Sequence, residues 1–291
     1  MIHANPSQYI ATLDPDDDYE EIVRLLQTVV FPWDTERALE FALFRTYAVP
    51  SISGLLAATG QFTQYTRKRY DDTELLLAEA VEHGLDSERG GAAIARMNDM
   101  HGRYKISNDN YLYVLSSFVF QPIRWMEQYA WRPMTDLEKR AWFNYYRALG
   151  QRMKIQELPD SFEAFEQFNL RYERKVFRYS RSNGDIAHAT KMLFLSFYLP
   201  KRLYGLASPF FDALLDPPLL AALGFKQPSS IFRCIVHAGL KFRALCLKCL
   251  PKNRTPVSFT GRQRPTYPMG YAIDRLGTFE GGITATPTNK S

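Results

Sequence analysis

The sequence is poor in the residues that build metal and disulfide sites. Its 291 residues include three cysteines and five histidines, and three cysteines do not form a disulfide framework in a chain of this length. No two histidines stand at the His-x-x-x-His spacing and none at Glu-x-x-His, so the usual ligand sets of zinc hydrolases and di-iron bundles are missing. Cys246-x-x-Cys249 is a single pair, a weak signal for a metal or redox site and equally typical of two small apolar residues on a helix.

Long apolar runs are missing too. The stretch 111–120, "YLYVLSSFVF", is shorter than the roughly 18 residues that a membrane-spanning helix needs. The first thirty residues contain no basic segment followed by an apolar block, so we expect no signal peptide. These absences predict a cytoplasmic protein. Gly-x-Ser-x-Gly, a phosphate-binding loop and a dinucleotide fingerprint are also missing, which argues against the enzyme classes that depend on them.

Helix signals are abundant, and no segment alternates apolar and polar residues in the manner of a strand. Asp14-Pro15 offers an N-cap with proline at the first helical position, and Thr135-x-x-Glu138 is a capping box. The chain is 46% hydrophobic, enough for a sizeable core. We predict an all-α fold of about ten to twelve helices in a single domain, 1–291, with an extended C-terminal tail from residue 251. Flexible ends are expected at 1–10 and 278–291, and the clearest helices at 71–84, 87–102, 184–199 and 229–251.

The positive charge is concentrated near the C-terminus. The chain carries a net charge of +5, and nine Lys or Arg residues but no Asp or Glu lie between 226 and 264. Residues 229–251 therefore predict a basic amphipathic helix, which either makes a peripheral contact with an anionic membrane surface or packs on the core with a solvated basic rim. No nucleic-acid-binding motif accompanies the charge, so no nucleic-acid partner is expected.

The stretch "RMNDMHGRY", residues 96–104, places a histidine at the end of an apolar helical stripe. His101 follows Gly90, Ala93, Ile94 and Met97 on one face of the helix predicted at 87–102. Two interpretations are open. A lone histidine on an apolar face is most often a hydrogen-bonded core residue. A stripe of small residues also lets a flat group approach, and the imidazole could then bind a haem iron.

A second stretch, "YTRKRYDDTELL" at 65–76, offers residues for the opposite side of such a group. Arg69 and Thr73 stand four residues apart and share a helical face if the helix begins early. The alternative is a solvated basic loop before an acidic helix start.

Together these stretches resemble the MpaB/rubber oxygenase family. The resemblance rests on "FPWD", "ALFRTYAVPSISGLLAATGQF", "RKRYDDT", "RMNDMHGRYKISNDNYLYVLSSFVFQPIRW" and the tail "RPTYPMGYAIDRLG", and runs from about Ile10 to Gly277. It implies a globin-like helical fold holding haem b, with His101 as the iron ligand and with Arg69 and Thr73 on the open side. Asp72 stands where the rubber-cleaving branch has a lysine. Residues 49–62 contain no carboxylate where that branch has a catalytic glutamate.

The resemblance also implies a function. An iron held by His101 leaves its far side open for O₂, where Arg69 would stabilise developing negative charge. We expect a haem-dependent oxygenase that cleaves a C=C bond of a hydrophobic, prenylated small molecule, drawing on O₂ and an electron donor. The further candidates for the haem pocket are Met97, Arg96, Arg103 and Tyr104, and Asp72 is grouped with Arg69 and Thr73 as catalytic. The alternatives are a haem-dependent hydroxylase, oxidase or peroxidase-like enzyme, and a globin-like protein that binds a gas without turnover.

Overall fold

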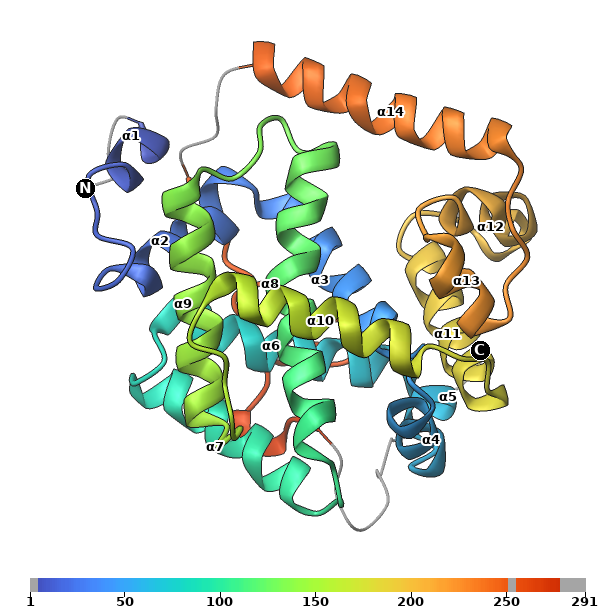
Figure 1. Cartoon of the computed structure of the whole chain (residues 1–291), viewed down its shortest axis with the longest axis horizontal. Coiled ribbons are helices and arrows are strands. Elements are labelled where there is room, and N and C mark those ends of the chain that lie inside the picture. The colour runs from blue at the N-terminus through green and yellow to red at the C-terminus, as the bar shows by residue number, and fades with distance from the viewer. Residues whose placement is uncertain (1–4, 251–254, 278–291) are drawn as a thin grey trace.

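The computed structural model describes residues 5–250 and 255–277, and in this part every regular element is a helix (Figure 1). The all-α prediction is therefore confirmed. Fourteen α-helices are present in these ranges, more than the ten to twelve expected, and the additional ones are two short helices, Pro6–Ile10 and Gln61–Gln64. Their bounds are α1 (Pro6–Ile10), α2 (Tyr19–Leu25), α3 (Pro32–Thr46), α4 (Pro50–Ala58), α5 (Gln61–Gln64), α6 (Thr66–His83), α7 (Glu88–Gly102), α8 (Asn108–Tyr129), α9 (Asp136–Arg152), α10 (Phe162–Val176), α11 (Arg181–Ser196), α12 (Tyr204–Asp212), α13 (Pro217–Leu223) and α14 (Ser230–Cys249).

Three short helices of other types complete the set. A π-helix, η1 (Leu26–Val30), continues α2, and 3₁₀ turns form at η2 (Lys201–Leu203) and η3 (Ile273–Arg275). The expected flexible N-terminal end is wrong for its last residues, because Pro6–Ile10 form α1 and Ile10 is buried in the core. The expected flexible C-terminal end, 278–291, lies outside the described residues.

The apolar core consists of two clusters that meet at α3. The larger cluster lies among α2, α6, α7, α8 and α9, and the smaller one lies among the end of α3, α11, α12 and α13. Phe41 and Leu43 on α3 pack against both clusters. Burial of such side chains supplies the main driving force for this arrangement, and α3 consequently forms a shared wall.

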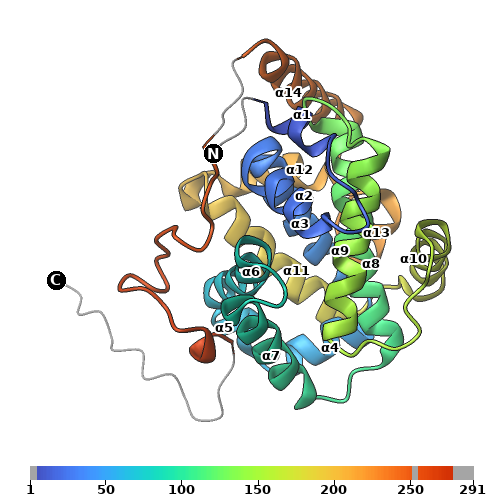
Figure 2. The same ribbon diagram turned by 90° about the vertical axis from the view of Figure 1, so that its left-hand side faces the viewer.

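A tight connection folds α7 back along α6. Gly84 ends α6 with φ 97°, a backbone conformation that favours glycine. Ser87 caps α7 by accepting a hydrogen bond of 2.9 Å from the backbone N–H of Gly90. A Cβ atom on Gly90 would lie 1.9 Å from the Gly84 carbonyl oxygen, so only glycine allows this approach. Figure 2 shows α6 and α7 as neighbours, and because the connection reverses the chain, the last turn of α7 lies toward the first turn of α6.

The C-terminal segment 255–277 crosses the surface of α6, as expected of an extended tail. Thr266 and Tyr267 donate hydrogen bonds to Asp71 and Asp72, and Tyr271 donates one to Glu79. All three acceptors lie on α6, and their side chains are fully buried. The segment therefore seals one face of the α6–α7 hairpin.

No single helix in the described ranges is long and apolar enough to cross a membrane. The pair α3 and α4 meets the requirements of length and composition jointly, but the chain bends by 93° between them. The apolar stretch 111–120 lies in α8, whose side chains are mostly buried in the larger core cluster.

Candidate functional site

His101 lies in the last turn of α7 and keeps an imidazole without a hydrogen-bond partner among the described residues. Its Nδ1 atom is buried, and the ring of Tyr111 contacts the imidazole edge-on at 5.6 Å between ring centres. Burial, together with the positive charge of Arg69, lowers the pKa of His101 to about 4. The imidazole is therefore neutral at physiological pH, the state in which a histidine binds a metal.

Arg69 approaches the same region from the first turn of α6. Its guanidinium group lies over the ring of Phe62 at 5.3 Å, and no carboxylate or carbonyl among the described residues accepts a hydrogen bond from it. Burial lowers the pKa of Arg69, and the nearby Asp72 carboxylate and the hydroxyls of Tyr47 and Tyr104 partly oppose that shift. A guanidinium group retains its proton in proteins, so a half-buried positive charge without a hydrogen-bonded counterion among the described residues lies near His101.

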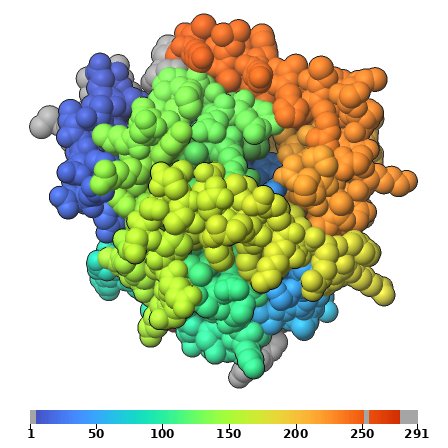
Figure 3. Space-filling model, viewed as in Figure 1, coloured from blue at the N-terminus to red at the C-terminus, as the bar shows by residue number. Residues whose placement is uncertain are grey.

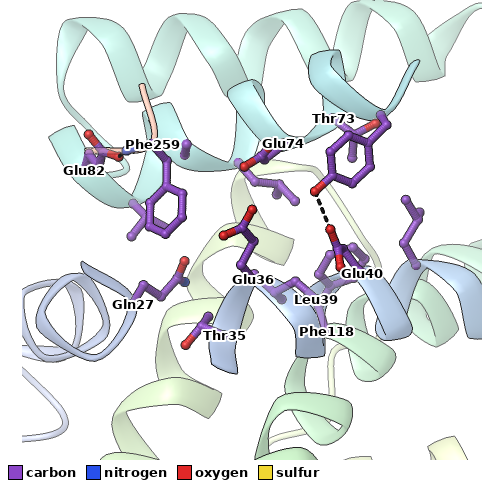
Figure 4. Close-up of a pocket in the computed structure, with 15 residues that line it drawn as sticks. Gln27, Thr35, Glu36, Leu39, Glu40, Thr73, Glu74, Glu82, Phe118 and Phe259 are labelled. Atoms are coloured by element: carbon purple, nitrogen blue, oxygen red, sulfur yellow. Dashed lines mark hydrogen bonds between the residues drawn. The ribbon is translucent and has the colours of Figure 1, made fainter. Parts of the chain in front are cut away.

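Thr73 shares the helix with Arg69 but is already bonded. Its hydroxyl donates a 2.9 Å hydrogen bond to the backbone carbonyl of Arg69, one turn earlier. The side chain also lines a cavity between α3 and α6. Thr73 thus lies on the wall of that cavity (Figure 4), one helical turn after Arg69.

Asp72 is buried in an ion pair that holds two parts of the chain together. Its side chain is fully buried, accepts a 2.8 Å hydrogen bond from Lys68 and accepts another from Tyr267. The same lysine donates to the carbonyl of Gly277 at 2.8 Å. Asp72 and Lys68 consequently fasten the C-terminal segment to α6, and each oxygen of the Asp72 carboxylate accepts one of these hydrogen bonds.

We expect Lys68→Met to destabilise the protein, because it leaves the Asp72 carboxylate buried without its cation. Breaking one half of a buried pair should lower the free energy of unfolding by about 3 kcal/mol. Lys139→Met is the matched control, since its partner Glu127 has a 47% exposed side chain and such pairs contribute less than about 1 kcal/mol. The free energy of unfolding of both variants is measured by urea unfolding. An equal decrease in the two variants would contradict this role for the Lys68–Asp72 pair.

The other residues predicted near His101 occupy different positions. Met97 is 7% exposed and belongs to the larger core cluster one turn before His101. Arg96 donates to the carbonyl of Leu276 at 2.8 Å and pairs with Asp99 at 3.0 Å. Arg103 pairs with the same carboxylate at 3.0 Å. Arg96 therefore holds the C-terminal segment against α7, and Arg103 lies at the surface.

The cavity between α3 and α6 contains residues that we did not predict. It has a volume of about 70 Å³. Glu40 accepts a 2.6 Å hydrogen bond from the Tyr70 hydroxyl (Figure 4), and Gln27 presents a buried amide. His101 does not line this cavity. The sequence signal that could have indicated this cavity is the group of charged residues at 36, 37 and 40 within the helix predicted from residue 34.

Haem is compatible with the residues around His101. Within the described ranges no group of three or more His, Cys, Asp or Glu side chains could hold a metal ion, whereas haem iron needs a single axial protein ligand. A neutral imidazole with an unpartnered, buried nitrogen meets that need. Arg69 adds a positive charge that no described carboxylate neutralises by direct contact. The donor chemistry therefore fits haem.

Comparison with known proteins identifies the family of the chain. Residues 21–246 match the family described as "ER-bound oxygenase mpaB/B'/Rubber oxygenase, catalytic domain". The chain is 30% identical over 257 residues to the ER-bound oxygenase mpaB' of Penicillium brevicompactum, which covers 82% of this chain and 60% of the relative. It is 31% identical over 226 residues to the ER-bound oxygenase mpaB of Penicillium roqueforti, covering 72% of this chain and 76% of the relative. The chain thus spans 60% of the length of the mpaB' relative.

Proposed function

This chain belongs to the family of the ER-bound oxygenases mpaB and mpaB' and the rubber oxygenases, and on that premise we propose that it is a haem b-dependent oxygenase acting on a hydrophobic, prenylated small molecule. The observation that carries the proposal is the pairing of His101 and Arg69. His101 lies in the last turn of α7 and Arg69 in the first turn of α6, near enough for the charge of Arg69 to act on the pKa of the imidazole. Neither has a hydrogen-bond partner for its side chain among the described residues.

Each residue has a distinct task in the proposed reaction. Haem bound at His101 would supply the binding and activation of O₂. His101 stays neutral because burial disfavours its protonated form, so its lone pair is available. Arg69 places a fixed positive charge where negative charge develops on oxygen, which lowers the barrier without reorganisation of solvent. The apolar residues of the core exclude water from the reaction.

The proposed outcome is cleavage of one C=C bond into two carbonyl groups, with both atoms of one O₂ ending in the products. The base-assisted route of the rubber-cleaving branch is not part of the proposal, because α4 carries no carboxylate. Ser53 of that helix instead donates a 2.5 Å hydrogen bond to Asn183. The proposed reaction therefore follows the mpaB-like branch of the family rather than the rubber-cleaving branch.

Oxygen consumption with a prenylated phenol and a reductant tests this function. We expect one O₂ to be consumed per double bond lost, and two shorter carbonyl products to form. A product that keeps all its carbons and gains a hydroxyl would support the hydroxylase alternative instead. Reversible O₂ binding by the reduced protein, without turnover of any prenylated compound, would support a gas-binding protein.

We also propose that α14 contacts an anionic membrane surface. The helix has no buried residue and lies along the upper edge of the molecule in Figures 1 and 3. Its inner face is attached through Arg243, which pairs with Asp34 at 2.9 Å, and through His237, which bonds the Tyr129 hydroxyl at 3.0 Å. Its outer face carries a stripe of large apolar side chains that are more than half exposed: Ile231, Ile235, Phe242 and Leu245.

An apolar stripe on a helix that has lysines but no acidic residue is typical of helices that lie in a membrane interface. We expect the protein to float with vesicles that contain anionic phospholipid. The double variant Phe242→Asp/Leu245→Asp should reduce the floating fraction about tenfold, because it puts negative charge on the helix face that would enter the membrane interface. Met269→Asp, at a residue 97% exposed outside α14, is the control and should float normally. A wild-type protein that stays below the vesicles would contradict this contact.

A further inference from the structure

The cavity between α3 and α6 combines an unsatisfied polar end with an apolar wall. Leu39 and Leu43 from α3, Leu77 and Val81 from α6, and Phe118 from α8 form the wall. Figure 4 shows Gln27 and Glu40 on opposite sides of the cavity, and Glu40 accepts the hydrogen bond from Tyr70. The cavity is partly open to solvent, so a ligand can reach it without unfolding the bundle.

Gln27 provides the polar end. Its side chain is 7% exposed, and its amide nitrogen has no hydrogen-bond acceptor. A buried donor without a partner costs about 1–3 kcal/mol, so native proteins rarely keep one. Gln27 belongs to the π-helix η1, and π-helical turns occur frequently at functional sites. The amide can therefore donate a hydrogen bond to an oxygen atom of a ligand.

The dimensions of the cavity suit one extended chain. Thr35 and Leu43 both line it, and the helical rise places them about 12 Å apart along α3. A single water needs roughly 10–15 Å³ by the same measure of volume, so 70 Å³ is room for about five such spheres. A length of about 12 Å with so small a volume describes a slot for a hydrocarbon chain rather than a space for a ring system.

The charged residues around the cavity favour an uncharged ligand. Glu36 pairs with Arg37 at 2.9 Å and with Arg262 at 2.8 Å. Glu40 pairs with Arg37 at 2.7 Å and Glu74 pairs with Arg264 at 3.0 Å, and burial raises the pKa of both carboxyl groups. Among the described residues, these pairs therefore offer no unpaired negative charge to an ammonium group of a ligand, and no unpaired positive charge to a carboxylate of a ligand.

From these observations we infer that the cavity binds an uncharged amphiphile, whose oxygen accepts a hydrogen bond from Gln27 and whose hydrocarbon chain lies along Leu39 and Leu77. This inference rests on the proposed function and deepens it, since a prenyl chain has the required shape. Thr73 lines the cavity and is bonded to the carbonyl of Arg69, so the bound chain lies one helical turn from the proposed site of O₂ chemistry.

Equilibrium binding of geraniol, a ten-carbon prenyl alcohol, tests the inference on the purified full-length protein by calorimetric titration. Gln27→Leu should weaken binding about tenfold, the equivalent of one hydrogen bond. Its melting temperature should be unchanged or higher, because an apolar group of similar shape replaces an unpaired donor. Leu77→Trp should abolish binding by filling the slot.

Gln121→Leu is the matched control. A terminal amide atom of Gln121 lies 3.2 Å from nitrogen atoms of Arg124 and Arg45, and the residue does not line the cavity, so geraniol affinity should be unchanged. The inference is overturned if wild-type protein does not bind geraniol, if Gln27→Leu binds it equally well, or if geranylamine or geranic acid binds more tightly. None of these results depends on haem, so they are separate from a failure of the proposed oxygenase function.

Discussion

Replacing His101 by alanine is expected to deprive the protein of haem. His101 offers a neutral imidazole at the end of α7, and no other described histidine combines burial with an unpartnered nitrogen. Loss of the axial ligand should reduce the haem content of the purified protein about tenfold or more, with the absorption of any remaining haem shifted. Haem content measured as pyridine haemochrome gives the result directly.

Two comparisons make this experiment specific to His101. His188→Ala removes an exposed imidazole on α11 and should leave the haem content unchanged. His101→Gly with added imidazole should recover haem, because the free ligand can occupy the space of the side chain. A His101→Ala protein with the haem content and spectrum of the wild type would remove His101 from the proposed site.

Replacing Arg69 by alanine is expected to lower the turnover rate with a prenylated phenol by about 10²–10³-fold while haem stays bound. The loss corresponds to one preorganised charge that acts on developing negative charge in a site shielded from water. Since Arg69 makes no hydrogen bond from its guanidinium group to the described residues, the substitution leaves no buried carboxylate without its direct partner. The measured quantities are the rate of O₂ consumption and the Soret absorption of the same sample.

Arg140→Ala is the control for this effect. Arg140 pairs with Asp16 on the surface of α9 and has a 62% exposed side chain, and such pairs contribute little to stability. Its turnover should match the wild type. An Arg69→Ala enzyme with undiminished turnover would show that another group supplies the electrostatic stabilisation.

Local sequence signals were sufficient for many of the helix ends. Thr135 and Glu138 form the predicted capping box, with both reciprocal hydrogen bonds present. The helix predicted at 87–102 is α7, so the placement of His101 in its last turn is confirmed. These features depend on hydrogen bonds between residues three or four positions apart, which a sequence pattern records.

The start of α2 shows where such signals compete. Asp14-Pro15 predicted a helix start, but α2 begins at Tyr19. The side chains of Asp14 and Asp18 accept hydrogen bonds from the backbone N–H groups of Asp16 and Asp14, at 2.9 and 3.0 Å. Short acidic side chains offer the backbone this alternative to a helix, so residues 14–18 form turns instead.

The candidate site depended on contacts that no local pattern records. Asp72 is bonded to Tyr267, which lies 195 residues later in the chain, and this contact assigns the carboxylate to the C-terminal segment rather than to catalysis. The cavity beside Gln27 exists only because α3 and α6 pack with a π-helix between α2 and α3. Long-range packing of this kind is specified by the whole core and not by neighbouring residues.

An absorption spectrum of the purified protein, recorded before and after incubation with haemin, tests the central claim most directly. The account predicts a Soret band that saturates at one haem per chain and changes on reduction. A folded protein that remains colourless, and that leaves added haemin with the spectrum of the free compound, would contradict it.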